Sequence, residues 1–249
     1  MNFNFKGGLG LIRKSLFSYM ASRSFFWTLA FSWMMGPLVY LFVWVVAAGN
    51  GSVGGFNRND FIFYYLILIV VNQMTYPASH WIIGESVQDG RLSVSLLRPL
   101  PVIYEGIAAD IALKVVCLPF VLAFVFIIGF TMGFHLIPAL QFVPLFILSL
   151  ALSQILRFMM AYDIALLAFW TQKIESLLSI NDTFVFLLAG QVAPVALLPG
   201  VIGKIAVIMP YRYMLGFPVE VLMGKLAGND ILIGLSFLVS GNAFPMGFR

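Results

Sequence analysis

Charged side chains are scarce in this sequence. Asp, Glu, Lys and Arg make up 10% of its 249 residues, whereas a soluble globular domain carries about 25%. No polar stretch is long enough for a soluble domain, since 61% of residues are apolar and the mean hydropathy is +1.00. Apolar runs of about 20 residues, long enough to cross a bilayer as a helix, recur from Phe25 onward. The sequence therefore predicts an integral membrane protein. The runs do not alternate with polar residues, which excludes a transmembrane β-barrel.

Cysteine is nearly absent, and the common catalytic motifs are absent altogether. The one cysteine, Cys117, lies inside an apolar run, so neither an intrachain disulfide nor a cysteine-based metal site is expected. The Gly-Lys pairs at 203–204 and 224–225 lack the upstream glycine and the following Ser or Thr of a phosphate-binding loop. We therefore expect no ATPase site, no other enzyme site and no cofactor in this chain.

The first 24 residues predict a helix lying on the membrane surface. Apolar residues between positions 5 and 19 recur at spacings of 4, 3, 4 and 3. Basic residues lie off that stripe, as in interfacial amphipathic helices. The next apolar run, residues 25–47, has 23 residues, which is too long for the apolar region of a signal peptide. We interpret it as a retained first span with a kink at Gly36-Pro37.

The rest of the chain predicts one polytopic all-α domain, residues 1–249, with about six transmembrane helices. Residues 193–230 are rich in proline and glycine, and their apolar pieces are too short to cross. This pattern favours a re-entrant hairpin shielded by protein. The last apolar piece, 231–244, has 14 residues, which is short for a span. Further spans are expected at about 61–83, at 107–130, within 141–170 and at 177–192.

The distribution of Lys and Arg predicts that the N-terminus lies in the cytoplasm, because basic residues favour the inner side of a membrane. Residues 84–101 and 171–176 then face the cytoplasm, and the 193–230 region faces outward. The formal net charge of +4 reflects these topology signals, so no nucleic-acid binding is expected. The inner side collects Lys6, Arg13, Lys14, Arg23, Arg91, Arg98 and Lys173, and the outer side Arg58, Lys204, Arg212 and Lys225.

Ionisable and polar residues inside the apolar runs are candidates for function, since they are costly there. Asp110 and Lys114 are four residues apart, so they predict a structural ion pair on one helix face, with a transport role as the alternative. Arg157 and Asp163 do not share a face. The weakest candidates, for contact with substrate, are polar or aromatic positions in the second span: Asn72, Gln73 and Tyr76.

The polar stretch 84–101 contains the most distinctive local pattern. Leu92 and Leu96 are four residues apart, so a short helix would show leucines on one side, and Arg98-Pro99 would end it. An apolar ridge on a cytoplasmic loop requires a partner. The alternative is that the leucines pack on the membrane or on the spans.

Three segments carry a resemblance to a known family. They are Leu96-Leu97-Arg98-Pro99; Ala189-Gly190-x-x-x-Pro194 with Leu198-Pro199; and Pro210-Tyr211-Arg212-Tyr213 followed by Pro218-x-Glu220-x-Leu222-x-Gly224. Over nearly its whole length the chain resembles the permeases of type-2 ABC transporters, in particular a subfamily of uncharacterised bacterial export permeases. It departs from them in its short sixth span, which leaves open a truncated chain, an altered end, or a span completed by a partner.

The resemblance implies a multi-pass exporter subunit in the bacterial plasma (inner) membrane, in contact with lipid. One permease forms half of the translocation pathway, and a second, identical or paralogous permease forms the other half. Cytoplasmic ATPase subunits would bind ATP and Mg, in agreement with the missing phosphate-binding loop here.

The resemblance also implies roles for particular segments. Residues 1–24 would be an interfacial connecting helix, and residues 84–101 a coupling loop. The expected coupling residues are Leu97 and Arg98, with Leu92 and Leu96 as docking contacts and Pro99 ending the helix. The re-entrant region would contain Gly190, Pro194, Pro199 and Pro210. Two other functions remain open: an ATP-independent carrier or channel, and an assembly subunit without a pathway of its own.

Overall fold

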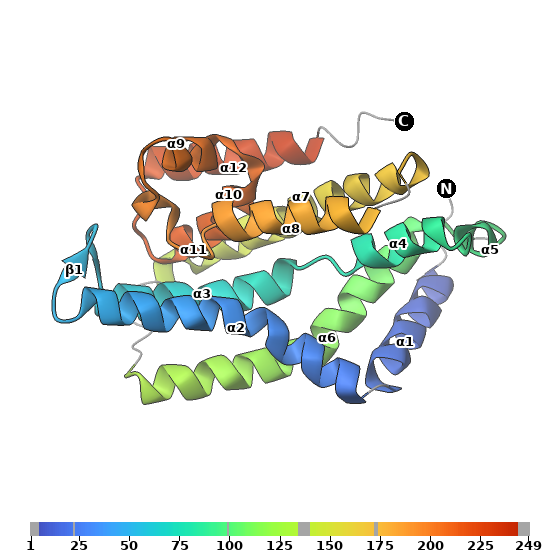
Figure 1. Cartoon of the computed structure of the whole chain (residues 1–249), viewed down its shortest axis with the longest axis horizontal. Helices are drawn as coiled ribbons and strands as arrows, with labels where there is room; N and C mark the ends of the chain where they lie inside the picture. The colour runs from blue at the N-terminus through green and yellow to red at the C-terminus, as the bar shows by residue number, and fades with distance from the viewer. Residues whose placement is uncertain (1–4, 22, 99, 134–139, 172–173, 244–249) are drawn as a thin grey trace.

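The computed structural model describes residues 5–21, 23–98, 100–133, 140–171 and 174–243, and it is 82% helical. The only strands in these residues form one short hairpin (Figure 1). The first half contains α1 (Phe5–Ala21), α2 (Arg23–Ala48), β1 (Ser52–Val53), β2 (Phe56–Asn57), α3 (Arg58–Thr75), α4 (Ser79–Gln88), α5 (Leu92–Leu96) and α6 (Ile103–Thr131). The second half contains η1 (Leu140–Phe142), α7 (Val143–Leu166), η2 (Leu167–Phe169), α8 (Ile174–Leu188), η3 (Val195–Leu197), α9 (Gly200–Ile208), α10 (Pro210–Met214), α11 (Gly216–Leu222) and α12 (Gly228–Ala243).

Three helical segments among the described residues are long and apolar enough to cross a membrane: Arg58–Gln88, Ile103–Thr131 and Val143–Phe169. Two shorter apolar helical stretches are Met34–Ala48 and Gly228–Gly241. The prediction of an all-α protein with several membrane helices is confirmed at this level. The total of six spans stays a prediction.

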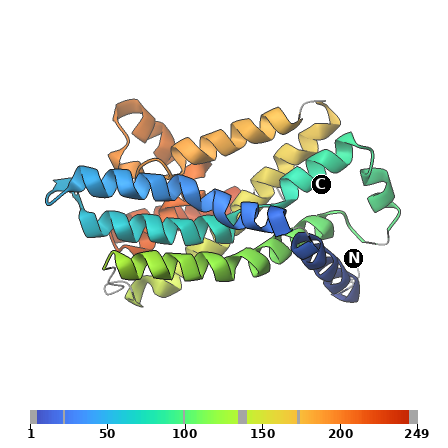
Figure 2. The same cartoon turned by 60° about the horizontal axis from the view of Figure 1, so that its bottom comes forward.

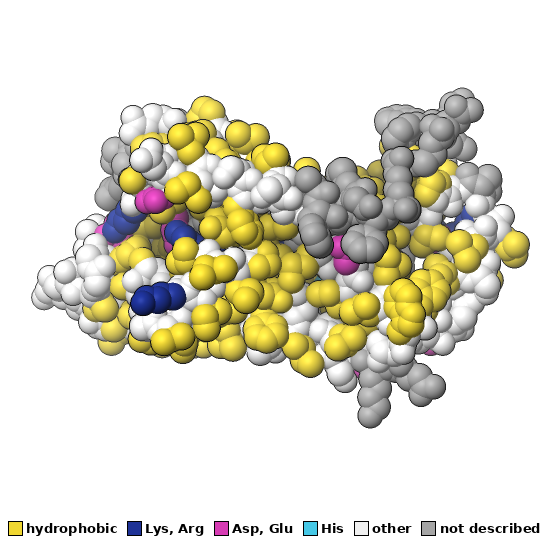
Figure 3. Space-filling view, turned by 90° about the horizontal axis from the view of Figure 1, so that it is seen from above, with side chains coloured by type: hydrophobic (Ala, Val, Ile, Leu, Met, Phe, Trp, Pro, Cys, Tyr) yellow, Lys and Arg dark blue, Asp and Glu magenta, His cyan; other side chains and the backbone are white. Residues whose placement is uncertain are grey.

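The segment made of α3 and α4 lies at the centre of the molecule. In an 18-residue apolar window of this segment 83% of the residues are buried, whereas the share in the corresponding windows of the spans at α6 and α7 is 22% and 28%. Both views show α2 and α6 running beside α3 (Figures 1 and 2), and large side chains of α3, among them Phe61, Tyr64 and Tyr65, fill the core between the helices. The outer helices expose many apolar side chains. Figure 3 shows one such face, on which hydrophobic side chains are widespread and charged ones are few. In a membrane, that surface contacts lipid.

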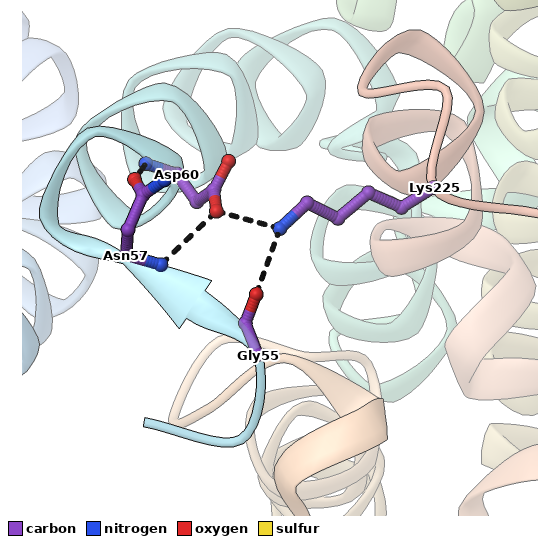
Figure 4. Close-up of polar contacts among 4 residues, drawn as sticks. All are labelled: Gly55, Asn57, Asp60 and Lys225. Atoms are coloured by element: carbon purple, nitrogen blue, oxygen red, sulfur yellow. Dashed lines mark hydrogen bonds and ion pairs between the residues drawn. The ribbon is translucent and has the colours of Figure 1, made fainter. Parts of the chain in front are cut away.

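A polar clamp closes the end of the molecule that carries the β-hairpin. Asn57 and Asp60 form a capping box at the start of α3. Lys225, in the link between α11 and α12, donates to Asp60 Oδ2 at 2.7 Å and to the Gly55 carbonyl at 3.4 Å (Figure 4). Its ammonium also lies 4.0 Å from the centre of the Phe56 ring. The clamp joins the α2–α3 hairpin to the C-terminal third of the chain.

The predicted second span, 61–83, lies inside the apolar segment Arg58–Gln88. The structure adds a break that was not predicted, because α3 ends at Thr75 and α4 begins at Ser79. At the predicted fifth span, helix α8 covers Ile174–Leu188 rather than 177–192, and it ends just before Gly190, whose φ is +92°. A helix, α1, occurs where one was predicted at the N-terminus, and its position on the membrane surface stays a prediction. Residues 1–4, Pro99 and residues 244–249 lie outside the described part of the chain.

Candidate functional site

The central helix is broken at residues 76–78 because of Pro77. The residue before a proline is driven out of the helical region of φ/ψ space, and Tyr76 accordingly has φ −61° and ψ 123°. The break leaves carbonyls at the end of α3 and N–H groups at the start of α4 without helical partners. In a membrane such groups must be satisfied within the protein.

Arg157 of α7 binds two side chains at the α3 side of the break. Its Nη1 donates to Asn72 Oδ1 at 2.8 Å and to Thr75 Oγ1 at 2.9 Å. The guanidinium carbon lies 5.5 Å from the centre of the Tyr76 ring, and the side chain is buried. A cation at a helix C-terminus opposes the negative end of the helix dipole, so Arg157 stabilises the helix end through both its charge and its hydrogen bonds.

Asp110 of α6 satisfies the α4 side of the same break. Its Oδ1 accepts a hydrogen bond from the Ser79 backbone N–H at 2.9 Å, while Ala78, the N-cap residue of α4, provides no side-chain cap of its own. A carboxylate at a helix N-terminus also complements the positive end of the helix dipole. Two intramembrane charges singled out by the sequence therefore lie at opposite sides of one helix break.

Asp110 and Lys114 form no direct ion pair among the residues that the structure describes, although the two charges still act on each other. Both residues instead line an apolar cavity of about 590 Å³ between α6 and α7, together with Gln154. The reason lies in the break: the Asp110 carboxylate points toward the start of α4.

His80, in the first turn of α4, extends the polar cluster to α8. It is fully buried, and its Nε2 lies 3.9 Å from Asp182 Oδ2 on α8. The rings of Tyr76 and Trp81 flank it at 5.9 and 5.6 Å between centres. Sequence reasoning did not single out Asp182. The signal was the polar pair Asn181-Asp182 inside the otherwise apolar fifth span.

The candidate substrate residues lie beside this cluster, inside the protein. Asn72, Gln73 and Tyr76 are all buried, and none lines the cavity between α6 and α7. Asn72 and Tyr76 contact Arg157, as described above. Their role in a substrate pathway stays a prediction, and in this conformation they hold the helix break.

The predicted coupling loop contains the expected short helix, α5. Gly90, with φ +70°, turns the chain from α4 toward it. One side of the loop is tied to α6, because Ser95 Oγ donates to Glu105 Oε2 at 2.9 Å and Arg98 forms an ion pair with the same carboxylate. On the other side Leu96 and Leu97 are 65% and 86% exposed. Arg98 is thus paired with a residue of the same chain, whereas the side chains of Leu96 and Leu97 are largely exposed.

Leu92, the other leucine of α5, is half-buried and lines a groove beside the helix. The coupling and docking roles of Leu92, Leu96, Leu97 and Arg98 stay predictions. Pro99 cannot be placed, since it lies outside the described residues.

The four residues proposed for the re-entrant region lie in or beside short helices. The Gly190 carbonyl accepts a hydrogen bond from Tyr64 Oη at 2.9 Å, and a Cβ at this position would overlap that hydroxyl. Pro194 precedes η3, Pro199 precedes α9, and Pro210 is the first residue of α10, where its missing N–H costs nothing. A re-entrant path for this region stays a prediction.

A buried ion pair crosses this region. Arg212 Nη2 donates to Glu220 Oε2 at 2.6 Å, joining α10 to α11. Both residues belong to the third motif that carries the family resemblance. The pair connects the first part of that motif, 210–213, to its second part, 218–224.

Across the described residues, no group of three or more His, Cys, Asp or Glu side chains could hold a metal ion. Comparison with known families gives one match: a family described as "ABC-2 family transporter protein" covers residues 31–245. No curated protein matches the chain.

Proposed function

The chain belongs to the ABC-2 family of transporter proteins, and from that premise we propose that it is the export permease of an ABC transporter. Permeases of this family are the membrane component of the transporter, and membership implies association with ABC ATPase partners. In our proposal the ATPases are separate cytoplasmic subunits that bind ATP and Mg, and a second permease, identical or paralogous, forms the other half of the pathway.

The single observation that supports this proposal is the uncovered leucine surface of α5. A helix of five residues whose polar side is tied to Glu105 and whose end exposes Leu96 and Leu97 gains little stability by itself. Exposed apolar patches on otherwise ordered segments mark interaction sites. A soluble partner that binds over Leu96 and Leu97 would account for their exposure in the isolated chain. The ATPase subunit is the partner that the family implies.

The membrane topology completes the proposal. Six spans cross the bacterial inner membrane with the N-terminus and α5 in the cytoplasm. Helix α1 lies in the inner interface. The segment from Pro194 to Gly224 forms a re-entrant pair at the outer side, next to the clamp made by Lys225.

The helix break offers a route by which force at α5 reaches the pathway. Helix α4 connects α5 to the break at 76–78. In our proposal a displacement of α5 therefore tilts α4 about the break. Asp110 of α6 holds the start of α4 and Arg157 of α7 holds the end of α3, and both halves of the central helix pack against α6 and α7. In our proposal ATP-driven closure of the ATPases tilts α4 about this break and moves substrate outward.

The first experiment asks whether an ATPase accompanies the chain. Affinity purification from native membranes in mild detergent, followed by mass spectrometry, is expected to recover a subunit with a phosphate-binding loop in stoichiometric amount. A chain that purifies alone, folded and monodisperse, would contradict the proposal and favour a carrier that does not use ATP.

The second experiment tests coupling through α5. Leu97→Asp is expected to abolish the stimulation of ATP hydrolysis that the permease gives to its ATPase, because a charge replaces the most exposed apolar contact. The complex should still reach the membrane, since Leu97 supports nothing within the chain. Leu97→Met is the matched control and should keep the stimulation. Normal stimulation in Leu97→Asp would remove α5 from the coupling route.

A further inference from the structure

The cavity between α6 and α7 opens on the lipid-facing surface. Both helices pack against α3 and α4 and make few contacts with each other, so a space of about 590 Å³ remains between them, with Met74 of α3 among its lining residues. Ligand sites in proteins have volumes of roughly 300–1,000 Å³. Isoleucines from both walls are between 39% and 59% exposed: Ile107, Ile111, Ile147 and Ile155. In a membrane an acyl chain can therefore enter this cavity from the side.

Three polar side chains line the otherwise apolar cavity, and part of their hydrogen-bonding capacity is unused. Asp110 is 3% exposed, and its Oδ1 accepts from the Ser79 N–H, but its Oδ2 is enclosed and has no hydrogen-bond partner. The side-chain oxygen of Gln154 is also enclosed without a partner. The Lys114 ammonium makes no hydrogen bond or ion pair with the described residues, although the charges of Asp110 and Arg157 act on it at longer range. Buried polar atoms without partners are rare in proteins, and each requires an explanation.

These three groups match a ligand that carries both a cation and an anion. Asp110 Oδ2 and Gln154 Oε1 accept hydrogen bonds, and one primary ammonium, with its three N–H groups, can donate to both. Lys114 is a donor with a positive charge, which suits a phosphate. Asp110 and Lys114 are one turn apart, about 6 Å along the axis of α6. A headgroup in which two carbon atoms link the ammonium to the phosphate ester fits that spacing.

We propose that the cavity between α6 and α7 binds a phospholipid whose headgroup carries a primary ammonium and a phosphate, as in phosphatidylethanolamine. The ammonium donates to Asp110 Oδ2 and Gln154 Oε1, the phosphate binds Lys114, and an acyl chain lies against the exposed isoleucines. This inference goes beyond the proposed function and does not depend on it, because the site requires neither the ATPase nor the transported substrate.

The charges of the cavity favour this headgroup over two other common ones. With Asp110 and Lys114 ionised, a neutral zwitterion adds no net charge to an apolar site, where an unpaired charge is costly. Phosphatidylglycerol has a net negative charge, which the Asp110 carboxylate opposes. The trimethylammonium of phosphatidylcholine has no N–H, so it leaves Asp110 Oδ2 and Gln154 Oε1 without a donor.

Lipid at this site would also act on the helix break. Asp110 caps the start of α4 through Oδ1 and would bind the lipid through Oδ2, so the lipid would hold the carboxylate in the orientation that caps Ser79. A ligand that binds only the folded state raises its stability. Phosphatidylethanolamine is therefore expected to raise the Tm of the delipidated protein more than phosphatidylcholine does.

Native mass spectrometry of the purified protein tests the site. Delipidated protein is incubated with equal amounts of phosphatidylethanolamine, phosphatidylcholine and phosphatidylglycerol that carry the same acyl chains. One phosphatidylethanolamine per chain is expected to remain bound at collision energies that remove the other two lipids. Lys114→Met and Gln154→Leu should each weaken its retention by roughly tenfold, because each removes a hydrogen bond to a charged group. Lys204→Met, which removes an exposed lysine outside the cavity, is the matched control and should retain the lipid.

A second variant blocks the cavity and leaves its polar groups in place. Ala151 lines the cavity and is exposed, so Ala151→Trp places an indole in the space that the acyl chain would occupy. The variant should lose the retained lipid. Phosphatidylethanolamine with a photoreactive acyl chain should label peptides of α6 and α7 that contain the lining residues, and this labelling should disappear in Ala151→Trp.

The possible results either support or overturn the inference. Equal retention of the three lipids, or labelling confined to other helices, would show only a general lipid coat and would overturn it. Stronger retention of phosphatidylglycerol, abolished by Lys114→Met, would indicate a simple anion site and would overturn the role of Asp110. If a polar variant fails to fold, as its melting curve would show, Ala151→Trp and the position of the label decide.

Discussion

The Asp110 carboxylate of α6 caps the backbone N–H of Ser79, 2.9 Å away, at the point where the central helix starts again after its break. Arg157 of α7 binds the other side of the same break through Asn72 and Thr75. A helix interrupted inside a membrane exposes a positive and a negative end close together, and this protein places one opposite charge at each end. The four predictions below follow from this break and from two other close contacts.

The oxygen acceptor that Asp110 provides for the cap can be tested separately from its charge. Asp110→Asn keeps an oxygen that can accept from Ser79, whereas Asp110→Leu has a similar shape and no acceptor. We expect the Leu variant to be less stable than the Asn variant by about 1–3 kcal/mol, the cost of leaving a buried N–H unpaired. Unfolding in detergent micelles, followed by tryptophan fluorescence, measures this difference. Equal stabilities would show that the cap contributes nothing.

Arg157 and Asn72 should be coupled energetically. A double-mutant cycle with Arg157→Met and Asn72→Ala is expected to give an interaction energy of about 1–3 kcal/mol, because one hydrogen bond to a charged group joins them. Ser236→Ala on α12, whose hydroxyl bonds only locally to the Ile233 carbonyl, is the control and should be additive with Arg157→Met. Additivity for both pairs would contradict a direct role of Asn72 in holding Arg157.

Gly190 should tolerate no side chain while Tyr64 keeps its hydroxyl. Its φ of +92° disfavours other residues, and a new Cβ would meet Tyr64 Oη. Gly190→Ala is expected to destabilise the protein by more than the roughly 1–3 kcal/mol of backbone strain alone. Adding Tyr64→Phe should restore part of that loss by removing the overlapping atom. A double variant less stable than Gly190→Ala would show that the lost hydrogen bond outweighs the relief.

Arg98 should act on coupling through Glu105. If Arg98 works by tethering α5 to α6, then Arg98→Met and Glu105→Gln should lower ATPase stimulation to a similar extent, and the double variant should be no worse than either single one. If Arg98 instead contacts the ATPase directly, Glu105→Gln should leave stimulation near normal. The rate of ATP hydrolysis in the reconstituted complex, at matched complex content, distinguishes the two cases.

Much of the fold could be predicted from the sequence because its signals are local. The 3.6-residue spacing in the first 24 residues predicted α1, and the leucine spacing in 84–101 predicted the short helix α5. Other features were missed because their signal is weak or distributed. Pro77 lies inside the predicted second span, 61–83, and was not interpreted as a helix end.

The candidate site was predicted in part of its residues and in none of its contacts. The sequence identified Asp110 as a member of an ion pair, Arg157 as a charge inside an apolar run, and Asn72 and Tyr76 as possible substrate contacts. The structure brings them to one place, the break in the central helix. Spacing along one helix could not reveal this, since the partners come from three different helices.

The sequence by itself determined that this is a membrane protein. With 61% apolar residues and long apolar runs, the chain exposes more apolar surface than water can accommodate, and a bilayer can cover that surface. It also determined which residues are costly there. Only the tertiary structure decided what those residues do. Asp110 and Ser79 are 31 positions apart, and Arg157 and Asn72 are 85 apart, so neither contact exists until the helices have packed. The physical reason is that a polar group in hydrocarbon takes the nearest partner in space, and which partner is nearest depends on the packing of helices that the local pattern does not specify.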